Sequence, residues 1–595
     1  MVEQTEYEQA EKRNVGLEDD DTTFFRQHAL KFFKRPAGIL QVMENIEQNE
    51  IGGLACFERK VIGILDLVYP RVREDIRRDR GRVDAFETSY PRTKLHHVSW
   101  GIFQPCKNFA IEASIRLSEQ RLLFPCAAIL LYFNIVLCER ERVHDDTMND
   151  IMERWFKIAF GALAVLYIAT WLFTIHIAQV QTDRGYTPTV PVLADDSQQY
   201  AGLSNALMQG RGFTLGNGPE TYRVPGYPAF ATAIRSIAGG SFFAVTFVQI
   251  LLVLGAALLI RKIGAAYATS TVGGIAALLF LVNPVVLVLA LTILTDTLFL
   301  FLFILGFYAA SILFEKRPVL AVIIAALAFS ACLYVRAMGL FALPIFIAPF
   351  LIASVPWKKK LIAMIIVMTV MLLSLVPWMQ RNYVQTGVFS FTSFTAINLA
   401  AYSVPMFHAW QNGTTVETEK EKLATAMNLP QDVWRDIKYS KEIDQFATQE
   451  LLAHPLSYLF YHVTLSLPFL FSSSLEYAFN TYKSAMHLPG EGTIGGINLL
   501  VRGDISGFVH AVTGQWWKVA ERILWILLYV FALIGLVPKR EKVATWVFMF
   551  SIAYLMFLAG PAANARYAVQ IQPFIFILAA CGMIWLYTSR WKQKQ

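Results

Sequence analysis

Ten long apolar stretches follow one another along this chain, and they constrain its fold more than any other feature. They are Ile158–Val180, Phe242–Ile260, Ile263–Val282, Leu298–Phe314, Val319–Val335, Gly339–Val355, Leu361–Trp378, Ile523–Val537, Val543–Gly560 and Ala568–Tyr587. A helix needs roughly 20 mostly apolar residues to cross the hydrocarbon core of a bilayer. Backbone in lipid must satisfy its own hydrogen bonds, so each stretch predicts a transmembrane α-helix. The sequence therefore predicts an all-α polytopic membrane protein with about ten transmembrane helices.

The composition supports this class of protein. Of the 595 residues, 55% are hydrophobic and only 16% are charged, whereas a soluble domain carries about 25% charged residues. The formal net charge of +7 comes with Lys and Arg clusters at the ends of apolar stretches, where membrane proteins collect them. We therefore expect membrane lipid as a partner and no nucleic acid.

The Lys and Arg clusters also predict the orientation of the bundle. They are Arg154/Lys157, Arg261/Lys262, Lys316/Arg317, Lys358/Lys359/Lys360, Lys539/Arg540/Lys542 and Arg590/Lys592/Lys594. If the ten helices alternate in direction, all six clusters fall on one side, which the positive-inside rule makes cytoplasmic. We expect an integral protein of a bacterial inner (plasma) membrane, with its functional residues on the periplasmic or extracellular side.

The chain divides into two predicted domains. Residues 1–150 are rich in charge, carry no recognisable catalytic motif and predict a cytoplasmic extension of unknown function; their apolar stretch Leu122–Cys138 is short. Met148 or Met152 directly precedes the first long apolar stretch and would suit an alternative start. Residues 151–595 form the transmembrane domain, with outer segments 181–240 and 379–522 that contain juxtamembrane helices and loops.

The segment Pro455–Phe471 tests the alternation. It is apolar enough to insert, but a single crossing here would move the cluster Lys539–Lys542 to the outer side. We therefore expect a re-entrant or interfacial helix. The alternative is a crossing that pairs with a weak span within Gly490–Val512.

A set of ionisable residues falls at the outer ends of different helices. The set comprises Asp195, Asp196, Arg223, Asp296, Arg336, Arg381 and Arg566. Ionisable groups at membrane depth are costly and usually functional. Each residue alone could be an ordinary polar helix end, but the set together predicts one shared site.

Short motifs surround these residues, in an order that resembles a known family. The motifs are Asp196-Ser-Gln-Gln-Tyr200, Gly210-Arg-Gly-Phe213, Arg223-Val-Pro-Gly-Tyr-Pro228, Leu294-Thr-Asp-Thr-Leu-Phe299, Tyr334-Val-Arg336, Pro377-Trp-Met-Gln-Arg-Asn-Tyr383 and Asn564-Ala-Arg-Tyr567. From Ile158 onward, the chain resembles integral-membrane glycosyltransferases of the GT-C fold. It is most similar to glycosyltransferase family 39, which contains protein O-mannosyltransferases and the aminoarabinose transferases of lipid A.

The resemblance implies a fold, a reaction and roles for residues. It implies a GT-C-like bundle that moves a sugar from a polyprenyl-phosphate donor to a protein, lipid or glycan acceptor. Asp196, four residues before Tyr200, would be the catalytic base. Asp296 stands where family members usually carry Glu. Supporting roles are expected for Asp195, Tyr200, Asp296 and Tyr383.

Elementary chemistry agrees with these roles. The donor needs cations for its phosphate leaving group, and Arg suits phosphate because its guanidinium presents forked donors. We expect Arg336, Arg381, Arg223 and Arg566 to bind the donor phosphate. The acceptor needs a carboxylate to take its proton during displacement at the anomeric carbon, and Asp196 can supply it.

Two alternatives stay open at this point. A secondary transporter or lipid flippase would place its ionisable residues near the bilayer midplane, within repeated halves. The scattered His residues show no metal-ligand spacing, so we expect no protein-only metal site and no certain cofactor. A divalent cation held by Asp195, Asp196 and the donor phosphate is compatible with the sequence.

Overall fold

The computed structural model describes residues 145–184, 188, 190–192, 195–216, 218–485, 506, 516–561 and 565–592. The predicted cytoplasmic extension up to residue 144, with Leu122–Cys138, lies outside these residues, as does nearly all of Gly490–Val512. The described secondary structure is helical, apart from one isolated β-bridge between Thr214 and Pro219. This confirms an all-α polytopic membrane protein.

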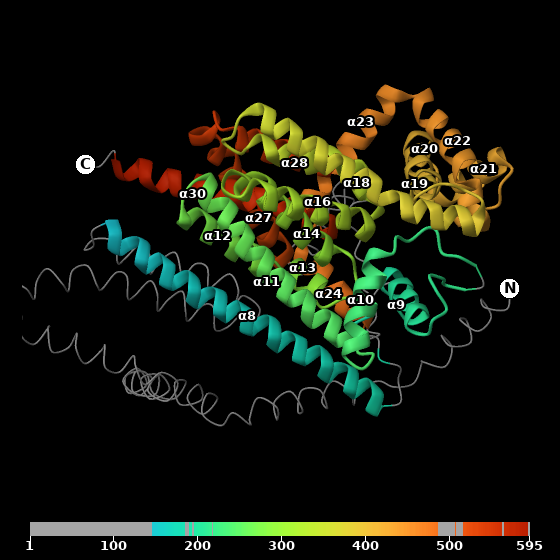
Figure 1. The fold of residues 1–595 in the computed structure, drawn as a ribbon, viewed down its shortest axis with the longest axis horizontal. Helices are drawn as coiled ribbons and strands as arrows, with labels where there is room; N and C mark the ends of the chain where they lie inside the picture. The colour runs from blue at the N-terminus through green and yellow to red at the C-terminus, as the bar shows by residue number, and fades with distance from the viewer. Residues whose placement is uncertain are drawn as a thin grey trace, which may run out of the picture. The chain divides into compact units, whose positions relative to one another are not determined.

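Within the described residues, seven helices are long and apolar enough to cross a membrane. They are α8 (Asp145–Asp183), α11 (Phe242–Tyr267), α14 (Asp296–Tyr308) continued by η2 (Ala309–Leu313) and α15 (Phe314–Lys316), α16 (Pro318–Val335), α18 (Trp357–Thr386), α27 (Trp516–Leu536) continued by η9 (Val537–Lys539), and α30 (Gln572–Lys592). Figure 1 shows these helices side by side around α14 and α16, which lie in the middle of the bundle.

The other three predicted spans are helical but short or broken. One is the pair α12 (Ser270–Val282) and α13 (Pro284–Ala290), which meet at an angle of 64°. Another consists of η3 (Ala337–Ala342), α17 (Leu343–Ile347) and η4 (Ala348–Leu351). The last is α28 (Val543–Ala559). Each of the ten apolar stretches thus coincides with a helical segment, and seven of these segments reach spanning length.

The predicted boundary between the second and third spans was wrong. We expected a loop at Arg261/Lys262, but α11 continues through both residues to Tyr267. Arg261 forms an ion pair with Glu153 of α8 and lies over the ring of Phe156 of the same helix. These contacts with α8 compensate the charge of Arg261, so α11 can continue through it. The turn follows at Thr269, whose side chain accepts a hydrogen bond from the backbone N–H of Val272 and caps α12.

Proline explains the two broken spans. Asn283 ends α12, and its side chain accepts from the N–H of Val285, which starts α13 in a new direction at Pro284. In the predicted span Gly339–Val355, Pro344 and Pro349 remove two backbone donors, and the segment changes between 3-10 and α geometry. Pro377, by contrast, lies within the continuous helix α18, which extends eight residues beyond the expected end at Trp378.

Shorter helices lie outside the transmembrane set. They are α9 (Asp195–Met208), α10 (Gly226–Ile237), α19 (Phe394–Asn398), η5 (Leu399–Ser403), α20 (Val404–Asn412), α21 (Val416–Met427), η6 (Gln431–Arg435), η7 (Ile437–Tyr439), α22 (Ser440–Ala453), α23 (Pro455–Ser466), η8 (Leu467–Phe471), α24 (Ser474–Ala485) and α29 (Ala565–Ala568). The predicted interfacial segment Pro455–Phe471 corresponds to α23 and η8, which are not among the helices that could span a membrane in the described part of the chain.

Helices α19 to α22 form a cap subdomain, residues 394–453, with a core of its own. Phe407, Leu423, Trp434 and Ile443 are buried there, apart from the core of the bundle. The cap subdomain is joined to the bundle near residues 221 and 222. Ser393 donates its N–H to the carbonyl of Thr221 at 3.1 Å, and the hydroxyl of Thr392 donates to the carbonyl of Tyr222 at 2.8 Å.

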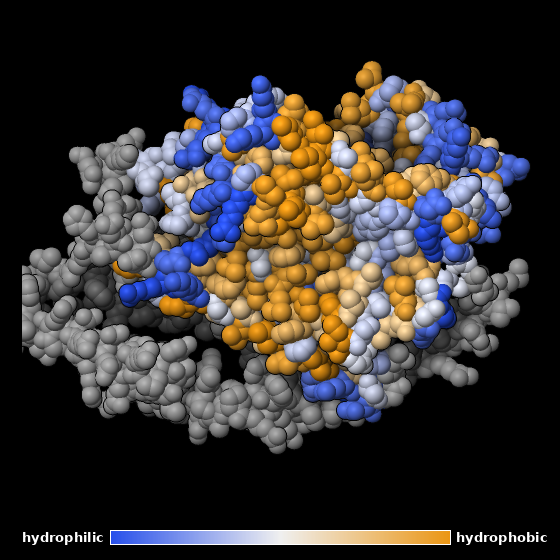
Figure 2. All heavy atoms as spheres, in the orientation of Figure 1, coloured by the Kyte–Doolittle hydropathy of each residue, from blue (hydrophilic) through white to orange (hydrophobic). Residues whose placement is uncertain are grey.

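The predicted alternation of helices agrees with contacts at one end of the bundle, which we call the basic end. Arg261 of α11 pairs with Glu153 of α8, and Lys542 donates to the carbonyl of Tyr267, the last residue of α11, at 2.8 Å. Clusters far apart in the sequence therefore meet at the same end. Figure 2 shows a broad apolar band between this hydrophilic end and the hydrophilic cap subdomain.

Which end faces the cytoplasm is testable by cysteine labelling. Gln411 in the cap subdomain and Lys359 at the basic end are both exposed. We expect a membrane-impermeant thiol reagent applied to intact cells to label a cysteine at 411 and to miss one at 359, in a background that lacks the six native cysteines. The Lys/Arg asymmetry is the physical reason. Labelling at 359 but not at 411 would invert the orientation.

Candidate functional site

The site is built around Asp196, which α9 presents at the end of the bundle opposite the basic end. In α9, Ser197, Tyr200, Leu203 and Ser204 are buried, at the spacing expected for one packed helix face. Asp196 lies at the rim of that face, and its side chain is 36% exposed. The carboxylate is therefore both anchored and accessible.

Two arginines from distant segments bind the carboxylate of Asp196. Arg223 Nη2 donates to Oδ1 at 2.5 Å, and Arg566 Nη1 donates to Oδ2 at 3.0 Å. Arg223 also donates from Nε to Gln199 Oε1 at 2.8 Å and lies 5.0 Å from the centre of the Tyr200 ring. The residues at 196, 199 and 200 thus act together on one arginine, as residues three and four apart on a helix can.

Asp296 forms the second half of the site. It is the first residue of α14 and its side chain is 2% exposed. Its Oδ1 accepts from Arg336 Nη1, and its Oδ2 accepts from Arg566 Nε at 2.7 Å. Arg336 ends α16 in an extended conformation, which takes its side chain out of the helix direction. A carboxylate is also stabilised at a helix N-terminus by the aligned peptide dipoles.

A buried hydrogen-bond chain fixes the backbone that leads into Asp296. Tyr227 of α10 donates its hydroxyl to Gln249 Oε1 at 2.7 Å. Gln249 Nε2 donates to the carbonyls of Ala290 and Thr292 at 3.0 and 2.8 Å. Both Tyr227 and Gln249 are fully buried. The turn between α13 and α14 is therefore tied to α10 and α11, which fixes the position of Asp296.

Arg566 connects the two carboxylates and completes an ionic network of Asp196, Arg223, Asp296, Arg336 and Arg566. Three guanidinium groups face two carboxylates, so the formal charge of the network is +1. Breaking a buried ion pair is costly because it leaves an uncompensated charge. An excess cation at a partly open site favours binding of an anionic group, above all phosphate, which matches the guanidinium fork.

The environment also sets the protonation of Asp196. Burial raises the pKa of Asp196, the nearby cations Arg223 and Arg566 lower it, and the net shift is downward from the ordinary value of 3.8. Because the folded-state pKa is lowered, the ion pairs of Asp196 stabilise the fold above pH 3.8. This contribution disappears as pH falls through the lowered pKa. Asp196 is therefore a carboxylate at any physiological pH.

The structure brings most of the predicted site residues together, but Arg381 lies outside the ionic network. Arg381 donates from Nη2 to the carbonyl of Phe213 at 3.0 Å and from Nη1 to that of Glu220 at 2.8 Å. It also lies 4.8 Å from the centre of the Trp378 ring. In this arrangement Arg381 holds the loop that leads to Arg223. Its predicted donor-phosphate role stays a prediction.

The loop contacts make Arg381→Lys informative. Lys keeps the charge but loses the fork that reaches two carbonyls. We expect faster trypsin cleavage at Arg211 in the Lys variant, because the loop of residues 211–222 loses an anchor. Limited proteolysis of the wild type and the variant measures this directly. Weakened donor binding with an unchanged cleavage rate would instead support the phosphate role.

The remaining predicted residues are placed as follows. Tyr200 contacts Arg223, whose Nη1 is 3.3 Å from the Tyr200 hydroxyl. Tyr383, in α18, is half exposed, and no hydrogen bond or ion pair among the described residues joins its side chain to the ionic network. Asp195 is the first residue of α9, and its side chain lies outside the described part of the chain.

The sequence reasoning missed Gln199, Glu220 and Tyr222. Glu220 Oε1 accepts from the backbone N–H groups of Tyr222 at 2.6 Å and Arg223 at 3.1 Å, which fixes the turn that carries Arg223. The ring of Tyr222 lies 4.7 Å from Arg223 and 5.4 Å from Arg435 of the cap subdomain. Gln199 could have been found from its helical spacing after Asp196. The roles of Glu220 and Tyr222 depend on loop geometry that no periodicity reveals.

Comparison with known families supports the predicted resemblance. The family model described as dolichyl-phosphate-mannose-protein mannosyltransferase matches residues 221–380 of this chain. The matched segment contains Arg223, Asp296 and Arg336, which are three of the five residues of the ionic network. This match confirms the resemblance that the sequence motifs predicted. No curated protein matches the chain.

Two solved structures are similar to this chain at low identity. One is the archaeal oligosaccharyltransferase AglB from Archaeoglobus fulgidus, in complex with an inhibitory peptide and a dolichol-phosphate, at 11% identity and a TM-score of 0.41; the alignment covers 73% of this chain and 51% of that one. The other is ArnT from Cupriavidus metallidurans bound to undecaprenyl phosphate, at 13% identity and a TM-score of 0.33, with 71% and 77% covered. The chain thus spans about half the length of the archaeal protein.

Proposed function

We propose that this protein transfers a sugar from a polyprenyl-phosphate donor to an acceptor at the non-cytoplasmic face of the membrane. The ionic network is the observation that carries the proposal. It places an accessible carboxylate next to an excess of guanidinium groups at one end of a membrane-spanning bundle. The family match over residues 221–380 supports the same reaction class.

The charge changes of the reaction suit this network. The bond between the anomeric carbon and the phosphate oxygen breaks, and a bond from the acceptor forms. Asp196 takes the acceptor proton, which removes one negative charge from the carboxylate. The departing polyprenyl phosphate gains one negative charge, which the arginines stabilise. Preorganised donors placed where charge develops are commonly the largest catalytic contribution.

The hydrogen-bonding groups of the arginines and of Asp196 suit these roles. A guanidinium has five N–H donors and a carboxylate accepts about four hydrogen bonds. Arg566 uses Nε and Nη1 on the two carboxylates, and Asp196 accepts from two arginines. Arg566 is central because it alone contacts both Asp196 and Asp296 in this network. We assign donor-phosphate binding to Arg566, with Arg223 and Arg336 in support.

The alternative to phosphate binding by arginines alone is a divalent cation held by Asp195, Asp196 and the donor phosphate. Both oxygens of Asp196 accept from arginines, so an added cation would compete with Arg223 or Arg566 for them. The described residues contain no group of three or more His, Cys, Asp and Glu that could hold a metal ion.

The network geometry disfavours the transporter or flippase alternative. Asp296 is the first residue of α14 and Arg336 directly follows α16, so both lie at helix ends. Transporters usually bind their substrate near the bilayer midplane. A site at one membrane face suits an enzyme whose donor head group lies at the interface.

Mass spectrometry of the cell envelope tests the proposed function. We expect cells with an intact gene to carry a sugar modification on an envelope protein, lipid or glycan that cells without the gene lack. An otherwise intact gene carrying Asp196→Asn should give the profile of the deletion. An identical set of envelope glycans in all three strains would contradict the proposal. The mass of the missing unit would identify the sugar. The molecule that carries this unit would identify the acceptor.

A further inference from the structure

A group of side chains around Tyr222, which we call the Tyr222 stack, links the cap subdomain to the ionic network. The Tyr222 ring is stacked on that of Phe394, with centroids 5.6 Å apart and an interplanar angle of 24°. The guanidinium carbons of Arg223 and Arg435 lie 4.7 and 5.4 Å from the centre of the same ring. Phe394 and Arg435 belong to the cap subdomain, whereas Arg223 binds Asp196. Tyr222 therefore contacts the cap subdomain and the ionic network at once.

The ring of Tyr222 can hold the Arg223 cation without using its hydrogen-bond donors. Cations are attracted to the face of an aromatic ring, most strongly where water is excluded, and both residues are buried. Arg223 keeps Nη2 for Asp196 and Nε for Gln199. Burial raises the pKa of Tyr222 to about 12, so the ring stays neutral at physiological pH. A neutral ring thus positions Arg223 and leaves its pairing with Asp196 intact.

Backbone contacts join the Tyr222 stack to the entry of the cap subdomain. The Thr392 hydroxyl donates to the carbonyl of Tyr222 at 2.8 Å, and the Ser393 N–H donates to that of Thr221 at 3.1 Å. The Ser393 hydroxyl donates to the carbonyl of Arg435 at 3.0 Å. One short segment thus binds both the backbone of Tyr222 and the backbone that carries Arg435. We expect a displacement of the cap subdomain to displace the stack as well.

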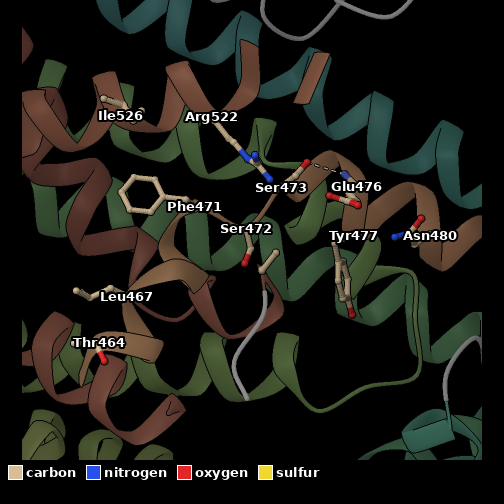
Figure 3. Close-up of a pocket in the computed structure, with 11 residues that line it drawn as sticks. Thr464, Leu467, Phe471, Ser472, Ser473, Glu476, Tyr477, Asn480, Arg522 and Ile526 are labelled. Carbon is tan, nitrogen blue, oxygen red and sulfur yellow. Dashed lines mark hydrogen bonds between the residues drawn. The ribbon is translucent and has the colours of Figure 1, made fainter. Parts of the chain in front are cut away.

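The second arginine that binds Asp196 lies beside a different feature of the molecule. Arg566 follows Ala565, which lines a cavity of about 720 Å³ between α23 with η8, α24 and α27 (Figure 3). Neither Tyr222 nor Arg435 is among the residues that line this cavity. The Tyr222 stack can therefore be altered by substitution without altering the lining of the cavity beside Arg566.

We propose that Tyr222 is a positioning residue, whose ring fixes Arg223 against Asp196 and makes the geometry of this pair depend on the docked cap subdomain. The inference deepens the proposed function and rests on it, because the reaction gives the pair its catalytic consequence. Asp196 takes the acceptor proton in that reaction, and a displaced Arg223 leaves its carboxylate free to adopt other orientations. The cap subdomain thereby acts on the chemistry through Tyr222.

Kinetics of sugar transfer by the purified full-length protein test the role of the ring. We expect Tyr222→Leu to lower kcat about tenfold, the scale of a desolvated cation–π contact, and to change the donor KM by less than about twofold. Donor-phosphate binding is assigned mainly to Arg566, so the loss should fall on kcat. Tyr222→Phe should match the wild type, because the stack uses the faces of the ring and not its hydroxyl group. Phe389→Leu removes an aromatic ring that is 51% exposed and is the control, which should also match the wild type.

Arg435→Gln tests the cap side of the Tyr222 stack. It should lower kcat by about two- to fivefold, less than Tyr222→Leu does, since Arg435 acts only through the ring. Added to Tyr222→Leu, it should cause no further loss, because residues that act through one contact are not additive. Lys438→Gln, at an exposed position of the same subdomain, is the matched control. Wild-type kcat in a folded Tyr222→Leu variant would overturn the proposal, and so would a Tyr222→Phe variant as slow as Tyr222→Leu.

Hydrogen exchange followed by mass spectrometry separates this inference from the proposed function, because it requires no transfer. Asp196 lies in the first turn of α9. We therefore expect peptides that cover residues 196–200 and 220–225 to exchange faster in Tyr222→Leu than in the wild type and in Tyr222→Phe. If exchange rises in this way but the wild-type protein transfers no sugar, the positioning role stands and the proposed function fails. If the wild type transfers sugar, and Tyr222→Leu changes neither kcat nor exchange, the proposed function stands and the positioning role fails.

Discussion

Asp196→Asn is expected to reduce sugar transfer by about 10²–10⁴-fold, the usual contribution of a general base. The amide keeps the shape of the side chain but cannot take the acceptor proton. Its loss also leaves Arg223 and Arg566 facing a neutral group. Turnover of a polyprenyl-phosphate sugar by purified protein measures the effect. Because Asp196 is 36% exposed, we expect the variant to remain folded.

Two comparisons make the Asp196 result decisive. Asp432→Asn, at an exposed position of the cap subdomain, is the matched control and should keep wild-type turnover. Asp195→Asn tests the neighbouring carboxylate. Near-normal transfer in Asp196→Asn together with loss of transfer in Asp195→Asn would move the base to Asp195. For the wild type, the lowered pKa of Asp196 predicts that any loss of activity through its protonation has its midpoint below pH 3.8.

Asp296→Asn is expected to cost about 3–5 kcal/mol of folding stability, the scale for removing one partner of a buried ion pair. Asp296 is 2% exposed, and the substitution leaves Arg336, itself 9% exposed, without its carboxylate. Arg566 loses its ion pair with Asp296 as well. Denaturant unfolding of the protein in detergent micelles, followed by a spectroscopic probe, measures the change.

A second substitution separates lost charge pairing from a general packing defect. Asp296→Asn combined with Arg336→Met removes both charges and should recover part of the stability, since an apolar side chain can replace a buried ion-pair member. Glu417→Gln breaks an exposed pair with Lys420 and should change stability by less than about 1 kcal/mol. A double variant that is less stable than Asp296→Asn alone would contradict the ion-pair explanation.

The sequence predicted the membrane fold because hydropathy is a local property. All ten apolar stretches coincide with helical segments. Five of the ionisable residues that were predicted to share a site meet in one ionic network. The partners within that network were not predictable. Arg566 binds a carboxylate 370 positions away in the sequence, and nothing local to either residue specifies that contact.

Other features escaped prediction for identifiable reasons. Arg261 was predicted to lie in a loop because nothing near it in the sequence compensates its charge. The compensating carboxylate is that of Glu153, which lies on another helix. Arg381 is an arginine at a predicted outer helix end, as the network arginines are. Its guanidinium nevertheless donates hydrogen bonds to backbone carbonyls. Each of these features is set by tertiary contacts.

The most direct test of the central claim is transfer by the purified protein itself. The protein would be supplied with undecaprenyl-phosphate sugars carrying a labelled sugar, together with an envelope fraction as acceptor. We expect labelled sugar to move to the acceptor fraction and free undecaprenyl phosphate to be released in equal amount. Asp196→Asn should give neither product. If no donor is consumed by the folded wild-type protein, while proteoliposomes containing it move the intact lipid-linked sugar across the bilayer, the protein is a flippase and the proposed function is wrong.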